Sequence, residues 1–289
     1  MHELITRLME EKPVITDGAW GTELMNRGLK KRECPEFWNL EHPDRVAEIP
    51  GLYVEAGSQV VLTNTFGANR FILEKHGLAD KVREINEAGV KISKKAANDK
   101  AGVFASIGPS GKLIVMKQVS ADELEAAFTE QAEACAEAGA DAIVIETMID
   151  ITEALAAVSA AKKTGLPVVA NMVFDAGVDK DRTMMGNPPE EVAEKFEAAG
   201  VDVIGSNCGK GIEGFIPICQ RMRAVTDLPL WMKANAGIPE IVKGETVYHT
   251  TPDQFAAFVP ELINAGANFI GGCCGTNPDF IAAVKEKIK

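Results

Sequence analysis

The sequence predicts an α/β protein that folds as a single (β/α)8 TIM barrel domain over residues 1–289. Three observations carry this prediction. Short β-branched or apolar runs alternate with longer segments of helical period along the whole chain. There are eight such runs, and no linker or change of composition divides them. Eight strand–helix units in a chain of this length are typical of the closed parallel barrel.

The predicted strands are short apolar runs bounded by polar or glycine turns. Such runs indicate strands buried on both faces, as in parallel sheets. An open doubly wound sheet is the main alternative, but no GxGxxG motif follows the first run. The eight runs cover residues 14–17, 59–63, 103–107, 142–146, 168–173, 201–205, 230–233 and 268–271.

The segments between the strands have helical period. Residues 122–139 carry apolar side chains at spacings of three and four, and Ser120 with Glu123 predicts a capping box at their start. Further helices are predicted over 153–163, 189–199, 253–265 and 279–287. Glycine at a helix end stops the helix in a left-handed conformation. Four such stops are predicted, within 55–58, 137–141, 198–202 and 264–268.

Residues 18–42 form a connection that is longer than usual after a barrel strand. They carry the aromatic residues Trp20, Phe37 and Trp38. Long connections of this kind usually cover a site or pack on the rim. We therefore expect this segment to pack against, or to gate, the site end of the barrel.

Composition excludes several classes of protein. The chain is 46% hydrophobic, which excludes disorder, and 30 Lys+Arg against 42 Asp+Glu give a net charge of −12 without a basic cluster, which argues against nucleic-acid binding. The apolar runs fall far short of the roughly 20 residues that span a bilayer. The N-terminus lacks the apolar core of an export signal, so we expect a cytoplasmic protein with reduced cysteines.

Polar side chains gather where the predicted strands end. In a barrel, these ends face the active site. Six cysteines occur in the chain, and three of them stand at such ends, flanked by glycines. The residues at these positions are Asp17, Asn64, Thr65, Glu146, Asn171, Asn207, Cys208, Asn235, Cys273 and Cys274.

Convergence of Cys208, Cys273 and Cys274 suggests a zinc site. Zn²⁺ prefers tetrahedral sulfur and nitrogen ligands, and a catalytic site leaves one position open. A thiol that enters this position loses its proton and becomes a nucleophile at neutral pH. Glycines around the adjacent pair allow both sulfurs to reach one metal.

The other three cysteines have simpler interpretations. A single cysteine is most often a small buried hydrophobic residue. Cys135 and Cys219 stand at helical spacing, so we expect both in the core. Cys34 lies in the long first connection, where it is structural or incidental.

Five segments together resemble the zinc-dependent homocysteine S-methyltransferase family. They are DGAWGTEL (17–24), GSQVVLTNTFGANR (57–70), IET (145–147), GSNCGKG (205–211) and GGCCGTNP (271–278). The similarity runs along nearly the whole chain in the order found in the family. It is closest in style to the homocysteine-binding module of cobalamin-dependent methionine synthase.

The resemblance implies a ligand set and a substrate. Zn²⁺ would be held by Cys208, Cys273 and Cys274, with the homocysteine sulfur as fourth ligand and a methyl group transferred to it to give methionine. Asp17 and Glu146 would bind the homocysteine ammonium, and carboxylates at strand ends suit a cationic amine.

Four further residues are expected around the substrate. Backbone groups of Gly18 and Ala19 would lie near the homocysteine carboxylate. The amides of Asn64 and Asn207 would orient substrate or metal ligands, or else satisfy the loop backbone.

The methyl donor is expected to come from outside the chain. Betaine-dependent members carry an aromatic residue after the glutamate, whereas Thr147 stands here, and no cobalamin-binding DxHxxG motif is present. We therefore expect a methylated corrinoid, such as methylcobalamin, on a separate protein or domain. S-methylmethionine and betaine stay open as alternative donors.

Two other functions compete. Lys233 at the end of the seventh predicted strand, with Gly275 and Thr276 before the last helix, would suit an aldolase or a phosphate-handling lyase. A zinc-binding scaffold without activity would also use the cysteines. The first alternative leaves the three cysteines unexplained, and the second leaves the two carboxylates unexplained.

Overall fold

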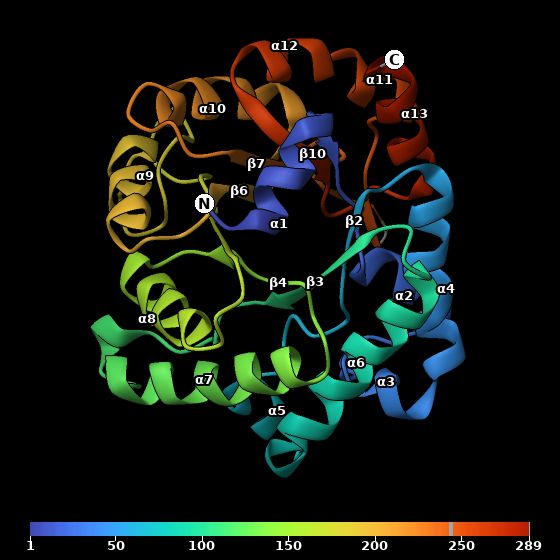
Figure 1. The fold of residues 1–289 in the computed structure, drawn as a ribbon, viewed down its shortest axis with the longest axis vertical. Helices are drawn as coiled ribbons and strands as arrows, with labels where there is room; N and C mark the ends of the chain where they lie inside the picture. The colour runs from blue at the N-terminus through green and yellow to red at the C-terminus, as the bar shows by residue number, and fades with distance from the viewer. Residues whose placement is uncertain (243–244, 289) are drawn as a thin grey trace.

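The computed structural model describes residues 1–242 and 245–288, so residues 243, 244 and 289 of the predicted domain lie outside the described residues. Eight parallel strands form one sheet in the order β1-β10-β7-β6-β5-β4-β3-β2. A parallel bridge between Thr16 and Val60 joins the first and last strands of this order. The sheet therefore closes on itself, and helices surround it (Figure 1). The predicted (β/α)8 barrel is confirmed.

All eight predicted strands are present. The largest difference is in β6, which continues past the predicted end at residue 205 because a register shift after Asn207 lets Gly211 pair with Asn235 of β7. This irregularity bends the strand end and turns its side chains toward the site. The strands are β1 Val14–Ile15, β2 Val60–Leu62, β3 Gly102–Ile107, β4 Ala142–Met148, β5 Val168–Met172, β6 Val203–Gly211, β7 Leu230–Asn235 and β10 Ala267–Gly272.

The helices follow the strands as the sequence predicts. Ser120 and Glu123 form the predicted capping box of α7. The four predicted glycine stops all have positive φ, between 74° and 115°. The helices that follow the strands are α4 Pro43–Ala56, α6 Val82–Ala97, α7 Ala121–Glu137, α8 Ile151–Lys162, α9 Pro189–Ala198, α10 Phe215–Arg223, α11 Pro252–Ala257, α12 Val259–Asn264 and α13 Pro278–Ile288. Two further short helices are α1 Glu3–Leu8 and α5 Arg70–Glu74.

One predicted helix is wrong in its extent. The structure divides residues 253–265 into α11 and α12, which meet at Phe258. Pro260 has no backbone N–H, so the hydrogen bond that would continue the helix across this point is missing. None of the helices in the described part of the chain is long and apolar enough to cross a membrane.

The connection over residues 18–42 is folded. It contains α2 Gly21–Asn26 and α3 Trp38–Glu41, and Trp38 is buried. The Glu36 carboxylate accepts a hydrogen bond from the Gly67 amide at 2.7 Å, which ties this connection to the segment after β2. The structure therefore shows that this segment packs on the rim of the barrel.

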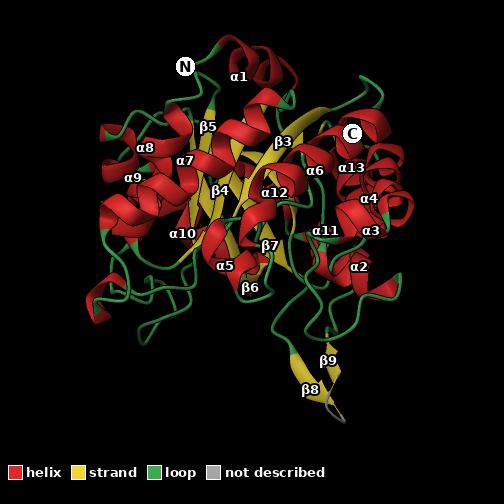
Figure 2. Cartoon of the chain, turned by 90° about the horizontal axis from the view of Figure 1, so that it is seen from below, coloured by secondary structure: helices red, strands yellow, loops and turns green. Residues whose placement is uncertain are grey.

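A hairpin that the sequence did not predict follows β7. Its strands β8 Glu240–Val242 and β9 Glu245–Val247 pair antiparallel and project from the body of the protein. Figure 2 shows the hairpin at one end of the barrel and α1 at the other. The hairpin stands at the carboxyl ends of the strands because it directly follows β7.

The hydrophobic core has two layers. Inside the barrel, Trp231 stacks between Phe104 and Phe269, and Ile5 of α1 joins this interior cluster from the amino ends of the strands. The larger cluster lies between strands and helices and includes Cys135 and Cys219, which confirms their predicted core packing. The interior is filled at the end near α1, so a site is left for the opposite end.

Candidate active site

Three cysteine sulfurs come together at the carboxyl ends of β6 and β10. Cys208 lies in the last part of β6, and Cys273 and Cys274 directly follow β10. The Sγ atoms of Cys208 and Cys274 are 3.9 Å apart, and all three sulfurs lie within 4.8 Å of one another. We call these three residues the sulfur cluster.

Backbone geometry turns the adjacent cysteines toward one point. The amide of Cys273 donates to Ala234 O at 2.7 Å, and the carbonyl of Cys274 accepts from Ala236 N at 2.9 Å, so β7 fixes the segment. A Cβ on Gly271 would come 2.0 Å from Thr16 Oγ1, which shows why a glycine precedes the pair. Cys208 itself has φ +64°, a conformation that non-glycine residues seldom adopt.

Contacts among the three thiols shift their pKa values in opposite directions. Hydrogen bonds from Cys273 and Cys274 lower the pKa of Cys208 to about 3. Contact with Cys208 raises the pKa of Cys273 and, as the largest effect, raises that of Cys274 to about 11, although the contact with Cys273 acts in the opposite direction on Cys274. These contacts therefore favour the thiolate form at Cys208 and the thiol form at Cys273 and Cys274. A bound cation would favour loss of the other two protons.

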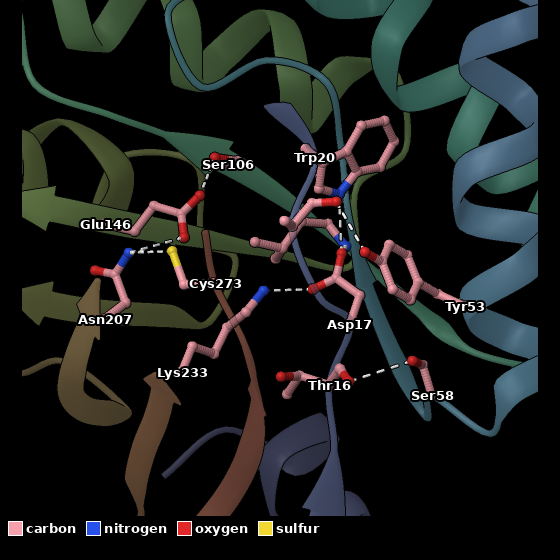
Figure 3. Close-up of polar contacts among 12 residues, drawn as sticks. Thr16, Asp17, Trp20, Tyr53, Ser58, Ser106, Glu146, Asn207, Lys233 and Cys273 are labelled. Atoms are coloured by element: carbon pink, nitrogen blue, oxygen red, sulfur yellow. Dashed lines mark hydrogen bonds and ion pairs between the residues drawn. The ribbon is translucent and has the colours of Figure 1, made fainter. Parts of the chain in front are cut away.

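Asp17 is fully buried and makes three hydrogen bonds. Its Oδ2 accepts from Trp20 Nε1 at 2.9 Å and from Leu62 N at 2.8 Å. Its Oδ1 forms an ion pair with the Nζ of Lys233 (Figure 3). The Lys233 side chain enters the barrel from β7, so this pair crosses the floor of the site.

The environment of Lys233 opposes the aldolase alternative. Burial alone would lower the pKa of Lys233, but the charges of Asp17 and Glu146 and the hydrogen bond to Asp17 outweigh it and hold this pKa above its ordinary value. A lysine that forms a Schiff base must lose its proton near neutral pH. Lys233 is therefore a fixed cation rather than a nucleophile.

Glu146 lies beside Cys273, on the opposite side of Lys233 from Asp17 (Figure 3). Its Oε1 accepts from Ser106 Oγ at 2.5 Å, and its Oε2 is 3.5 Å from Asn207 Nδ2. Burial raises the pKa of Glu146, and Lys233 and Ser106 offset part of that rise. A buried carboxylate at the end of a strand thus faces the centre of the site (Figure 3).

Asn207 connects Glu146 with the sulfur cluster. Its Oδ1 accepts from Thr147 N and its Nδ2 donates to Thr147 Oγ1, both at 2.7 Å. The same Nδ2 is 3.9 Å from Cys273 Sγ. Thr147 has φ +61°, which is costly for a β-branched residue, so its two hydrogen bonds with Asn207 help to hold it.

Three other predicted site residues already make hydrogen bonds or close packing contacts within the protein. Asn64 Nδ2 donates to Pro35 O at 2.7 Å and to Asn39 Oδ1 at 2.9 Å, which anchors residues 18–42. Ala19 N donates to Thr276 Oγ1 at 3.1 Å, and a Cβ on Gly18 would meet the Tyr53 hydroxyl at 2.7 Å. The structure packs this backbone tightly, and its expected contact with a substrate carboxylate stays a prediction.

Sequence reasoning missed Ser106, Tyr53 and Tyr248. Ser106 stands two residues after buried Phe104 in a predicted strand, so the alternation of strand faces was a usable signal for it. Tyr53 in α4 donates to Ala19 O at 2.8 Å, and Tyr248 after β9 packs on Gly275. Both reach the site from elements whose position the local sequence does not specify.

Comparison with known proteins defines the class. A family model described as homocysteine S-methyltransferase matches residues 14–288. The chain therefore belongs to the homocysteine S-methyltransferase family. This confirms both the resemblance and the class of enzyme that the sequence predicts.

Individual relatives and structures agree with this class. Methionine synthase of Mycobacterium leprae is 31% identical over 99% of this chain, and that of Mycobacterium tuberculosis is 30% identical over 97%. The chain spans 25% of each of these proteins. The homocysteine methyltransferase MmuM of Escherichia coli, in its metallated form, matches with a TM-score of 0.82 and 24% identity over 98% of this chain and 99% of that chain. The MmuM structure thus shares the fold.

Proposed function

We propose that this chain transfers a methyl group to the sulfur of homocysteine, giving methionine, with Zn²⁺ held by Cys208, Cys273 and Cys274. One observation carries the proposal: three cysteine sulfurs from two strand ends lie within 4.8 Å of one another at the site end of the barrel. Family membership supports homocysteine as the acceptor.

The sulfur cluster fits a zinc ion. With Zn–S bonds of about 2.3 Å, sulfurs of a tetrahedral site lie roughly 3.8 Å apart. The distance of 3.9 Å between Cys208 and Cys274 agrees with this value. Three sulfur donors leave one position of the tetrahedron for a substrate, as in catalytic rather than structural zinc sites.

Bound zinc would supply a thiolate nucleophile from homocysteine at neutral pH. The residues of the chain then bind and orient the amino-acid part of the substrate. Glu146 offers a buried carboxylate to the ammonium, and its hydrogen-bond donors in the described part of the chain, Ser106 and Asn207, are uncharged. Asp17 adds a second carboxylate, whose charge Lys233 balances. Asn207 keeps the segment of Glu146 at a fixed distance from the sulfur cluster.

We also propose that the methyl donor is a methylated corrinoid carried by a separate protein or domain. The matched methionine synthases are about four times the length of this chain, which supports a donor outside it. Exposed apolar side chains support a protein as the carrier. Of twelve large exposed ones in the described residues, ten follow the carboxyl ends of β1, β2, β3, β5 and β7, around the site.

Such a surface suits a docking protein better than a free small donor. Exposed apolar side chains that gather at one end of a protein are typical of surfaces that contact another protein. Donors with small leaving groups, S-methylmethionine and betaine, are the alternatives. The reduced thiols that the zinc site needs support a cytoplasmic location.

Metal analysis with and without thiol tests the zinc proposal. The reduced protein should hold about one zinc per chain, and Cys208→Ala should lose it because two sulfurs bind zinc far more weakly than three. With Co²⁺ in place of zinc, homocysteine should add a sulfur-to-metal charge-transfer band. Activity is then compared for methylcobalamin, S-methylmethionine and betaine. A reduced protein without affinity for zinc or cobalt would overturn the proposal.

A further inference from the structure

Tyr248 connects the β8–β9 hairpin with the sulfur cluster. It directly follows β9, and its side chain is partly buried. Its aromatic ring lies on Gly275, the residue after Cys274, because a Cβ at Gly275 would come 2.3 Å from Tyr248 Cγ and 2.4 Å from Cδ2. A side chain at position 275 would therefore push the ring away from the cluster.

This packing places the Tyr248 hydroxyl near the sulfurs. The hydroxyl lies within hydrogen-bonding reach of the Cys274 side chain, and the charges of Cys208 and Cys273 also act on it. A phenol keeps its proton at neutral pH, so the hydroxyl is available as a hydrogen-bond donor. A cysteine sulfur that binds a metal has lost its proton and can only accept.

The backbone on both sides of Tyr248 is fixed. Val247, before it, pairs with Glu240 of β8. Thr250, after it, packs on Gly237, where a Cβ would come 2.5 Å from Thr250 Oγ1. Both contacts lie at the base of the hairpin, whereas its tip projects from the barrel (Figure 2). Tyr248 is therefore held at the rim, next to the cluster.

A hydrogen-bond donor at this point matches the charge of the proposed metal site. Three thiolates around Zn²⁺ leave an excess of negative charge, and a thiolate substrate in the open position adds to it. Hydrogen bonds to charged acceptors are roughly twice as strong as those between neutral groups, and such bonds to metal ligands fix the orientation of the ligand. The Tyr248 hydroxyl is placed to offset part of the excess charge.

We propose that Tyr248 is a positioning residue of the metal site, whose hydroxyl donates a hydrogen bond to the sulfur of Cys274 when this sulfur binds the metal. The inference rests on the proposed zinc site. A sulfur that accepts a hydrogen bond donates less electron density to the metal. Tyr248 therefore acts on the charge of the site as well as on the position of one ligand.

Tyr248→Phe tests this role because it keeps the ring on Gly275 and removes the hydroxyl alone. In the cobalt-loaded protein, the sulfur-to-metal charge-transfer bands should move to longer wavelength, since a sulfur without the hydrogen bond gives up an electron more easily. Zinc affinity, measured by competition with a chelator, should fall about 10- to 100-fold. Tyr53→Phe is the matched control. It removes the hydroxyl of the other tyrosine in the chain, which donates to Ala19 O, and should change neither quantity.

Two results would overturn the inference. Cobalt bands at the wild-type wavelengths in folded Tyr248→Phe would do so even if the metal binds more weakly, because a change of packing lowers affinity without altering the sulfur donors. Equal band shifts in Tyr248→Phe and Tyr53→Phe would do so as well, since the effect would then not be specific to the hydroxyl beside Cys274. Failure of the wild type to bind zinc or cobalt would instead overturn the proposed function.

Discussion

Glu146 shows how a single side chain combines a stability cost with a binding role. Burial raises its pKa, so the folded protein holds a proton on this carboxyl more tightly than the unfolded chain does. The charged form therefore costs stability at pH values above the raised pKa, and the cost disappears as the pH falls through it. A residue kept at such a cost is a candidate for function.

Glu146→Gln separates these two effects. The variant should bind homocysteine about tenfold more weakly or worse, because a neutral amide replaces the carboxylate that faces the ammonium. Its Tm at pH 7 should be unchanged or higher, because a buried charge has been removed. Calorimetry and thermal unfolding measure the two quantities. Full homocysteine affinity in a folded, zinc-loaded variant would contradict the assigned role.

Two of the seven non-glycine residues with positive φ in the described chain lie at the site. Cys208 and Thr147 have φ +64° and +61°, and both are next to or within the polar cluster around Asn207. Residues in this region are held by surrounding contacts at a cost of order 1–3 kcal/mol each. The neighbouring residues in the sequence do not predict a positive φ at either position, so this geometry is found only in the structure.

At the scale of elements, the packing of residues 18–42 depends on the buried carboxylate of Glu36. Glu36 is 4% exposed, accepts from Gly67 N at 2.7 Å and receives the thiol hydrogen of Cys34 at 3.4 Å. Burial, the largest effect, raises the pKa of Glu36. As with Glu146, stability is expected to rise as the pH falls toward that raised pKa.

Glu36→Gln tests this element. The amide oxygen still accepts from Gly67 N, while the buried charge is lost, so the Tm at pH 8 should rise by about 2–4 °C, which corresponds to about 1 kcal/mol. The difference from the wild type should shrink toward pH 5. Thermal unfolding across this pH range measures it. A lower Tm at pH 8 would show that the charge itself stabilises the segment.

Some elements could be predicted from the sequence and others could not. The eight strands were predicted because each is a short apolar run, and the four glycine stops because left-handed helix ends favour glycine. The β8–β9 hairpin was missed because its strands are short and partly charged and β8 is exposed, so no buried face imposes a pattern there. Pro260 indicates the break between α11 and α12, but the prediction of a single helix over 253–265 did not take it into account.

At the scale of the whole molecule, one end of the barrel is closed, and the connections at the other end carry most of the large exposed apolar side chains of the described residues. Ile5 of α1 fills the interior at the first end. At the other, Val178 after β5 and Ile241 of the hairpin are 98% and 68% exposed. This asymmetry fits a partner that docks over the site while the opposite end only needs to be sealed.

Charged substitutions on this surface test the docking of a donor protein. Val178→Glu and Ile241→Glu should slow methyl transfer from a protein-bound corrinoid about tenfold or more, because each places a charge in an apolar contact. Transfer from free methylcobalamin should stay unchanged, since the sulfur cluster is intact. Leu52→Glu on α4, away from this end, is the matched control. Equal slowing with both donors would argue against a docking surface.

The sequence by itself determined the barrel, the convergence of Cys208, Cys273 and Cys274, and the family. Strand burial, helix stops and strand-end chemistry are local patterns, and closure of the barrel then brings strand ends together whatever lies between them. Only the tertiary structure decided that Asp17 pairs with Lys233, that Asn207 holds Thr147 and that Asn64 anchors a loop. These contacts join residues that lie 25 to 216 positions apart. Each polar side chain has several possible partners, and packing of the closed barrel selects among them.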